Sequence, residues 1–158
     1  MKPFTEETAL LWATSRCASR ECCRQEIRKK WQDGGLDAAT CDTLLDRLED
    51  DGFIDENRYA RAYVHDKLEY DHWGRIKICQ ALRLKGISRN DINAAMAEVI
   101  DDEHYRDILR SCLRQKLRTL RFDPDDREES YKAVQKLVRF AASRGFEPEL
   151  IFRETDDL

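Results

Sequence analysis

The stretch LEDDGFIDENRYA, residues 48–60, joins two segments of helical pattern and decides how the chain divides on either side of it. Gly52 follows a run of apolar residues at helical spacing, where a glycine can take the left-handed conformation that ends a helix. The two apolar residues after it can pack over this turn, and Asp55 can accept N–H groups at the start of the next helix. We therefore interpret one set of residues as a structural joint between two helical units: Gly52, Phe53, Ile54, Asp55 and Tyr59.

The same punctuation by glycine and proline recurs along the rest of the chain. Residues that favour helices fill the segments between these breaks, β-branched residues are few, and no proline interrupts an apolar periodicity. The pattern predicts an all-α fold of nine helices. They run from about residues 5 to 15, 19 to 34, 37 to 52, 55 to 68, 74 to 86, 88 to 99, 102 to 120, 125 to 145, and from 148 onward.

Some details of these helices depend on single residues. Ser19 is expected to cap the second helix, and Asp125 the eighth. The apolar periodicity also predicts inward-facing side chains at Leu84 in the fifth helix and at Tyr131 and Val134 in the eighth.

A helix stop followed by an apolar residue occurs three times, at Gly35–Leu36, Gly86–Ile87 and Gly145–Phe146. This recurrence predicts three tandem three-helix units. We place their boundaries at residues 1–54, 55–101 and 102–158, the last with a short C-terminal tail. A unit of this size buries little apolar area alone, so we expect the units to stack into an elongated, curved rod.

Composition argues against several classes of protein. The 158 residues are 41% hydrophobic and 38% charged with a net charge of −4, and no apolar run approaches the roughly 18 residues that span a bilayer. The N-terminal residues lack the apolar core of a secretion signal, so we expect a cytoplasmic protein without a membrane partner.

The chemistry-bearing residues form no recognisable site. The six cysteines include no C-x-x-C pair, the three histidines stand at no ligand spacing, and we expect the thiols to be small buried side chains. No nucleophile elbow, phosphate-binding loop or glycine-rich dinucleotide turn is present. We therefore expect no catalytic residue, no metal and no cofactor, and a protein that is not an enzyme.

Charge is segregated along the chain. Six basic residues lie between Arg16 and Lys30, the segment 42–56 is strongly acidic, and residues 74–90 contain five bases and no acid. Arginines from Arg106 to Arg121 then recur every three or four residues on one helical stripe. Such runs are commonly solvated faces. Here, however, one-sign charges at four-residue spacing repel one another, and a polyanionic partner would reverse that cost.

The basic segments predict a binding face for an anionic partner. Arginines outnumber lysines 19 to 9, which suits bidentate contact with phosphate or carboxylate, so nucleic acid and an acidic protein surface both remain open. Because the acidic segment would be repelled by DNA, any direct DNA contact is expected to be weak and one-sided. The predicted face consists of Arg75, Lys77, Arg83, Lys85, Arg106, Arg110, Arg114 and Arg118.

Residues 48–60 resemble the signature of the RecX family, the bacterial regulators of the RecA recombinase. A second matching block contains Gly74-Arg75-Ile76-Lys77-Ile78, then Leu82 and Lys85-Gly86-Ile87. The likeness extends over about residues 9–155, although Cys23 stands where the family usually has leucine and the third unit matches by pattern alone.

This resemblance implies three tandem three-helix units and a role in DNA repair, homologous recombination and the SOS response. It further implies a monomeric, non-catalytic protein that binds the RecA recombinase or its single-stranded DNA filament. Binding would inhibit filament growth, ATP hydrolysis and strand exchange.

Two other functions remain alternatives at this point. Three-helix units resemble helix-turn-helix domains, so the chain could be an autonomous DNA-binding regulator. Against this, no unit has a recognition helix rich in both arginine and base-reading amides. The chain could also be a helical-repeat scaffold for another protein.

Overall fold

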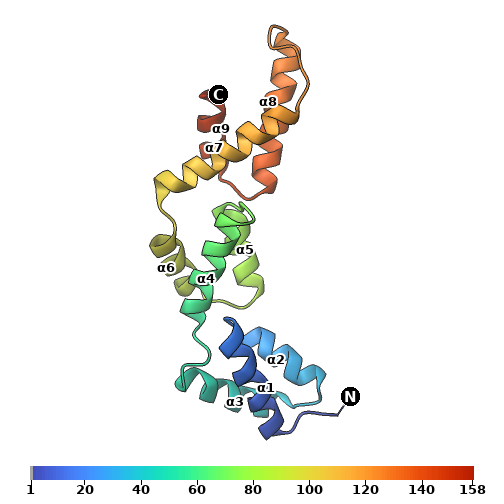
Figure 1. Cartoon of the computed structure of the whole chain (residues 1–158), viewed down its shortest axis with the longest axis vertical. Helices are drawn as coiled ribbons and strands as arrows, with labels where there is room; N and C mark the ends of the chain where they lie inside the picture. The colour runs from blue at the N-terminus through green and yellow to red at the C-terminus, as the bar shows by residue number, and fades with distance from the viewer. Residues whose placement is uncertain (1) are drawn as a thin grey trace. The chain divides into compact units, whose positions relative to one another are not determined.

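The computed structural model describes residues 2–158, and in this range the chain forms nine α-helices and no strand (Figure 1). The prediction of an all-α fold is confirmed. The helices are α1 (Glu6–Ser19), α2 (Arg24–Asp33), α3 (Ala38–Asp50), α4 (Glu56–Glu69), α5 (Arg75–Leu84), α6 (Arg89–Val99), α7 (Asp102–Thr119), α8 (Arg127–Ser143) and α9 (Pro148–Asp156).

Short polar side chains begin several of these helices. At α1 the Thr5 hydroxyl accepts the backbone N–H of Thr8 at 3.2 Å, and the Thr5 N–H donates to the Thr8 hydroxyl at 2.8 Å. At α3 the Asp37 carboxylate accepts the N–H of Thr40 at 3.2 Å. These contacts satisfy first-turn amides that have no partner inside the helix.

The predicted cap at Ser19 is wrong. α1 continues to Ser19, whose hydroxyl donates back to the carbonyl of Arg16 at 2.9 Å, so this residue belongs to the last turn of α1. α2 begins only at Arg24, after Cys23, which makes no side-chain capping bond. Cys22 and Cys23 are buried, so packing of the segment between α1 and α2, and not a hydroxyl cap, fixes where α2 begins.

Other local predictions also need correction. The cap of α8 is Asp126, one residue later than expected. Leu84 is 80% exposed, because it lies about 200° around the helix from the buried Leu82. Tyr131 and Val134 are exposed as well, since α8 buries a stripe of every fourth residue. That stripe consists of Ala133, Leu137 and Ala141.

The helices gather into two compact units. The first compact unit comprises Met1–Ala62 and Leu82–Ala95 and contains α1, α2, α3, the start of α4 and most of α6. The second compact unit comprises Tyr63–Ala81 and Met96–Leu158 and contains the end of α4, most of α5, and α7, α8 and α9. None of the helices described combines the length and the apolar character needed to cross a bilayer.

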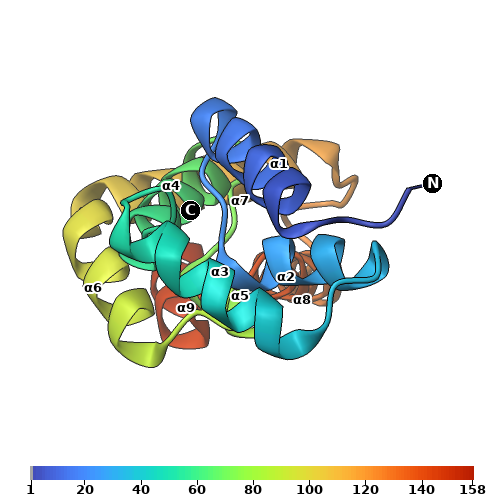
Figure 2. The ribbon, with the colours of Figure 1, turned by 90° about the horizontal axis from the view of Figure 1, so that it is seen from below.

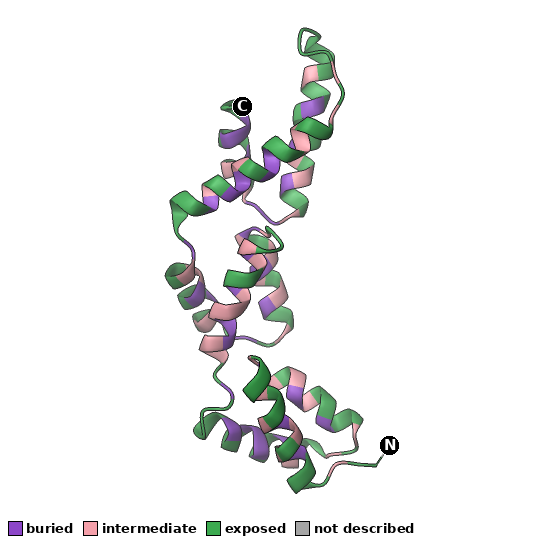
Figure 3. Cartoon of the chain, in the orientation of Figure 1, coloured by how far each residue is buried: buried purple, intermediate pink, exposed green. Residues whose placement is uncertain are grey.

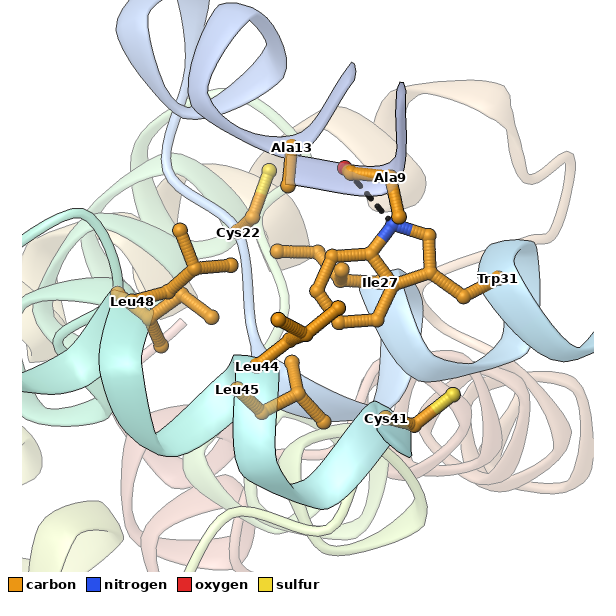
Figure 4. Packing of buried hydrophobic residues seen from close by; sticks show 10 residues of the cluster. Ala9, Ala13, Cys22, Ile27, Trp31, Cys41, Leu44, Leu45 and Leu48 are labelled. Carbon is orange, nitrogen blue, oxygen red and sulfur yellow. Dashed lines mark hydrogen bonds between the residues drawn. The ribbon is translucent and has the colours of Figure 1, made fainter. Parts of the chain in front are cut away.

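The core of the first compact unit lies where α1, α2 and α3 meet, and Figures 1 and 2 show α1 beside the other two helices. Trp31 is fully buried there, and its indole N–H donates to the carbonyl of Ala9 at 3.0 Å (Figure 4). This bond removes the cost of burying an unpaired donor. The buried core consists of Ala9, Ala13, Cys22, Ile27, Trp31, Cys41, Leu44, Leu45, Leu48 and Ile54.

In the second compact unit, the start of α5 meets the turn after α8 through backbone contacts. The N–H of Gly74 donates to the carbonyl of Arg144 at 2.7 Å, and that of Ile76 donates to the carbonyl of Gly145 at 3.0 Å. A Cβ atom on Gly74 would lie 2.4 Å from the carbonyl carbon of Gly145. Gly74 is therefore required for close approach of two backbone segments.

Helices α7, α8 and α9 carry many of the buried apolar residues of this unit (Figure 3). The rings of Tyr105 and Phe146 lie 5.3 Å apart between centroids, in a tilted arrangement that favours aromatic pairs. The buried set includes Tyr105, Leu109, Leu113, Leu137, Ala141, Phe146 and Ile151.

Candidate partner-binding surface

The residues interpreted as a joint lie at the turn between α3 and α4. Gly52 has a φ of +79°, and the buried Ile54 belongs to the core of the first compact unit. Asp55 accepts the N–H of Arg58 at 3.0 Å, which is a capping contact at the start of α4. Phe53 packs less completely and remains 39% exposed.

Side chains from α2 and from the segment just before it hold the start of α4. The Tyr59 hydroxyl donates to Glu26 at 2.8 Å, and the guanidinium of Arg58 donates to Glu21 at 2.5 Å. Arg58 also donates to the carbonyl of Gly52 at 3.2 Å. These internal contacts support our proposal that the 48–60 motif has a structural role.

Arg75, a member of the predicted binding face, is held by the protein's own acids. Its guanidinium donates to Glu147 at 2.8 Å and to Asp102 at 2.6 Å, and it stacks 4.0 Å from the ring centroid of Tyr105. Burial is the largest single effect and disfavours its charge, but the hydrogen bond and charge of Glu147, together with Tyr105 and Asp102, raise the pKa of Arg75 overall. Its side chain therefore links α5 to α7 and to the start of α9.

Tyr105 completes this network. Its hydroxyl accepts the backbone N–H of Arg75 at 2.9 Å and donates to the carboxylate of Glu147. Burial, together with the bond to Glu147, raises the pKa of the Tyr105 phenol, so it remains a hydrogen-bond donor. The network consists of internal contacts of the second compact unit.

Arg110 is likewise committed to an internal partner. Its Nε donates to Glu154 at 2.5 Å, and its Nη1 donates to Asp107 at 3.1 Å. Glu154 on α9 is only 2% exposed. The bond to Glu154 raises the pKa of Arg110. Arg110 thus compensates a buried carboxylate.

Three further members of the predicted face have half-buried side chains. Lys85 donates to Glu26 at 3.3 Å in the first compact unit. Lys77 lies 4.4 Å from the ring centroid of Trp73 in the second. Arg106 is half-buried, and its Nε has no hydrogen-bond partner within the described chain.

The remaining three, Arg83, Arg114 and Arg118, are exposed and form no ion pair among residues 2–158. Arg83 belongs to the first compact unit, whereas Arg114 and Arg118 lie one turn apart on α7 in the second. The structure therefore separates the eight predicted residues by environment. Only these three combine exposure with an uncompensated charge.

The sequence did not indicate the acids that neutralise Arg75 and Arg110. Glu147 lies 72 residues from Arg75, and Glu154 lies 44 residues from Arg110. Neither acid stands at a helical spacing from its arginine, so no local pattern in the sequence could have paired them.

The described part of the chain contains no group of His, Cys, Asp and Glu side chains that could hold a metal ion. All six cysteines are free thiols, and four of them are buried. Burial raises the pKa of Cys17 to about 12 and that of Cys23 to about 11, which leaves both in the protonated form.

Comparison with known proteins gives consistent matches. Residues 55–96 match the family description "RecX, second three-helix domain", and residues 103–153 match "RecX, third three-helix domain". Among solved structures, the crystal structure of RecX from Lactobacillus salivarius superposes with a TM-score of 0.82 at 17% identity, covering 97% of this chain and 96% of that one. This structural likeness shows the shared fold.

Curated relatives extend the match in sequence. The regulatory protein RecX of Clostridium botulinum is 32% identical over 80% of this chain, and the alignment spans 57% of that relative's length. The regulatory protein RecX of Pseudomonas fluorescens is 30% identical over 86% of this chain and 82% of its own length. With all-helical architecture, two matching three-helix domains and these relatives, the chain belongs to the RecX family.

Proposed function

We propose that this protein is a non-catalytic cytoplasmic regulator that binds the RecA recombinase or its single-stranded DNA filament. In this proposal it inhibits filament growth, ATP hydrolysis and strand exchange. Membership of a family of regulatory proteins supports it, as does the resemblance of residues 48–60 to the family signature.

The observation that carries the proposal is the pair Arg114 and Arg118 on α7. Both side chains are exposed and lack an ion pair in residues 2–158. They stand four residues apart, about 6 Å along the helix axis. Two cations at this spacing repel each other, and an anionic surface of a filament would relieve that repulsion.

The internal contacts narrow the proposed contact set. Arg75, Arg110 and Lys85 already pair with carboxylates of this chain, so engaging a partner would require breaking those pairs. We therefore assign the main contacts to Arg83, Arg114 and Arg118.

The experiment is a titration of RecA ATPase on single-stranded DNA with the full chain. We expect the wild-type chain to inhibit, and the double variant Arg114→Gln/Arg118→Gln to require at least about tenfold more protein, as for two lost charge-assisted contacts. The control double variant Arg139→Gln/Arg153→Gln removes the same charge from exposed positions on α8 and α9 and should inhibit normally.

Each outcome has a separate meaning. A wild-type chain that leaves the ATPase unchanged would overturn the proposed function and favour a scaffold role. If the wild type inhibits and the Arg114/Arg118 double variant inhibits equally well, only the assigned contact surface is overturned. Tight, sequence-selective binding to duplex DNA without recombinase would instead favour the autonomous DNA-binding regulator.

A further inference from the structure

The basic segment between Arg16 and Lys30 divides into two groups in the structure. Arg24 pairs with Asp46 at 3.0 Å and with Glu49 at 2.7 Å, and Arg28 pairs with Asp42. These two arginines of α2 therefore neutralise acids of α3. The rest of the basic segment does not take part in this neutralisation.

Three of the remaining cations converge on one pocket between α1 and α2, with a volume of about 360 Å³. All three are exposed. The volume falls within the range of roughly 300–1,000 Å³ that is usual for small-ligand pockets. The pocket is lined by Trp12, Arg16, Arg20, Cys22, Glu26, Ile27 and Lys30.

Glu26 is the single acid that lines this pocket, and other groups compensate it. It accepts the Tyr59 hydroxyl at 2.8 Å and pairs with Lys85 at 3.3 Å, with Arg20 further away at 3.9 Å. Arg16 and Lys30 have no ion pair anywhere in residues 2–158. The pocket therefore keeps a net positive charge that a bound anion would complement.

The other walls of the pocket are neutral. The half-buried indole of Trp12 forms one wall, with the Lys30 ammonium 5.8 Å from its ring centroid. Ile27 and Cys22 are buried at the floor. Burial raises the pKa of the Cys22 thiol, so no thiolate opposes an anion there. Lys30 has a flexible stem, which lets its ammonium move from the ring face to a neighbouring anion.

We propose that this pocket binds one nucleotide of a single-stranded polynucleotide, with the phosphate held by Arg16, Arg20 and Lys30 and the base stacked on Trp12. The carboxylates of an acidic peptide could use the three cations, but they offer no planar ring for Trp12. Single-strand-binding proteins combine the same two elements, a basic track and an aromatic platform. The proposal goes beyond recombinase inhibition and holds whether or not the chain inhibits RecA.

The test measures binding of the full chain, without recombinase, to a fluorescent oligothymidylate of about 20 nucleotides, longer than the ~4–16 that a binding module covers. We expect Arg16→Gln/Arg20→Gln to bind roughly tenfold more weakly, with a salt slope shallower by about 1.4, as for two lost phosphate contacts. Trp12→Leu should bind roughly five- to a hundredfold more weakly with an unchanged salt slope. Thermal melting by circular dichroism checks that each variant is folded.

The matched control is again Arg139→Gln/Arg153→Gln, which should bind the oligothymidylate like the wild type. Wild-type binding that does not decrease in the Arg16/Arg20 double variant overturns the proposal. Wild-type chain that shows no binding at low salt also overturns it.

Competition separates the classes of ligand. Unlabelled oligothymidylate should displace the probe, whereas thymidine monophosphate should do so far less well, and an oligoglutamate of equal charge should be weaker than the oligonucleotide. Oligoglutamate that competes equally would assign the pocket to an acidic protein segment and overturn the proposal. If thymidine monophosphate competes as well as the oligothymidylate, the pocket is a site for a free nucleotide, and its assignment to a polynucleotide strand is overturned.

Discussion

Arg110 on α7 donates from its Nε to Oε2 of Glu154 on α9 at 2.5 Å, and from its Nη2 to Oε1 of the same carboxylate at 3.4 Å. Because Glu154 is 2% exposed, this two-point contact provides the counter-charge for a carboxylate that water does not reach. The regular arginine stripe on α7 thus includes one residue, Arg110, that pairs with a buried carboxylate of the same chain.

Replacement of Arg110 should therefore affect stability more than replacement of Arg114. We expect Arg110→Gln to lower the melting temperature, because the buried Glu154 would lose its charged partner. Arg114→Gln is the matched control on the same helix and should change the unfolding free energy by less than about 0.5 kcal/mol. Thermal melting by circular dichroism measures both, and equal melting temperatures would contradict the structural role of Arg110.

Two glycine-to-alanine substitutions should differ for steric reasons. Gly74→Ala would place a Cβ atom 2.4 Å from the backbone of Gly145, and we expect it to cost at least about 1–3 kcal/mol of stability. Gly52→Ala meets no atom within 4 Å and should cost only about 1–2 kcal/mol, from its positive φ.

Denaturant unfolding measures the stability of both alanine variants. Gly52→Asn provides a further control, because asparagine tolerates the left-handed conformation and should be milder than alanine there. A Gly74→Ala variant as stable as the wild type would show that the α5 contact can separate at little cost.

Stability should depend on pH through Glu56. Burial is the main cause that raises the pKa of this carboxyl above its ordinary value of 4.5, although it accepts the N–H of Arg24 at 3.3 Å. Between 4.5 and the higher folded value, the native state binds more protons than the unfolded state. The contribution of Glu56 to the unfolding free energy is therefore present below 4.5 and is lost as pH rises through the folded value.

The variant Glu56→Gln removes this dependence while it keeps an acceptor for the Arg24 amide. Relative to the wild type, its unfolding free energy in urea should increase from acidic to neutral pH. A difference between variant and wild type that stays constant across this range would show that Glu56 ionises as freely in the native state as in the unfolded chain.

The thiols of Cys17 and Cys23 should resist alkylation in the native protein. Burial raises their pKa values to about 12 and about 11 from 9.0, and the thiolate is the form that reacts. We expect iodoacetamide at mildly alkaline pH to modify both residues at least about tenfold more slowly than in the guanidinium-unfolded chain. Mass spectrometry of the modified peptides measures the two rates, and rapid native labelling of Cys17 would contradict the raised pKa of this partly buried thiol.

The sequence predicted those features that depend on neighbours within one or two turns. The capping contact of Asp55 and the helix stop at Gly52 both follow from residue type and spacing. The helix cap predicted at Ser19 and the inward-facing side chain predicted at Leu84 also depend on near neighbours, and both predictions are wrong. A serine can end a helix as well as begin one, and Leu84 stands two residues from Leu82, on the opposite side of α5.

By itself, the sequence determined the helical class, most helix limits and the family, because helix propensity, capping and the spacing of apolar residues are local properties. Only the tertiary structure decided which cations are available to a partner. Arg75 and Arg110 meet carboxylates 72 and 44 residues away, whereas Arg114 and Arg118 meet none in the described chain. A carboxylate neutralises a guanidinium through proximity in space, and folding sets that distance independently of separation along the chain.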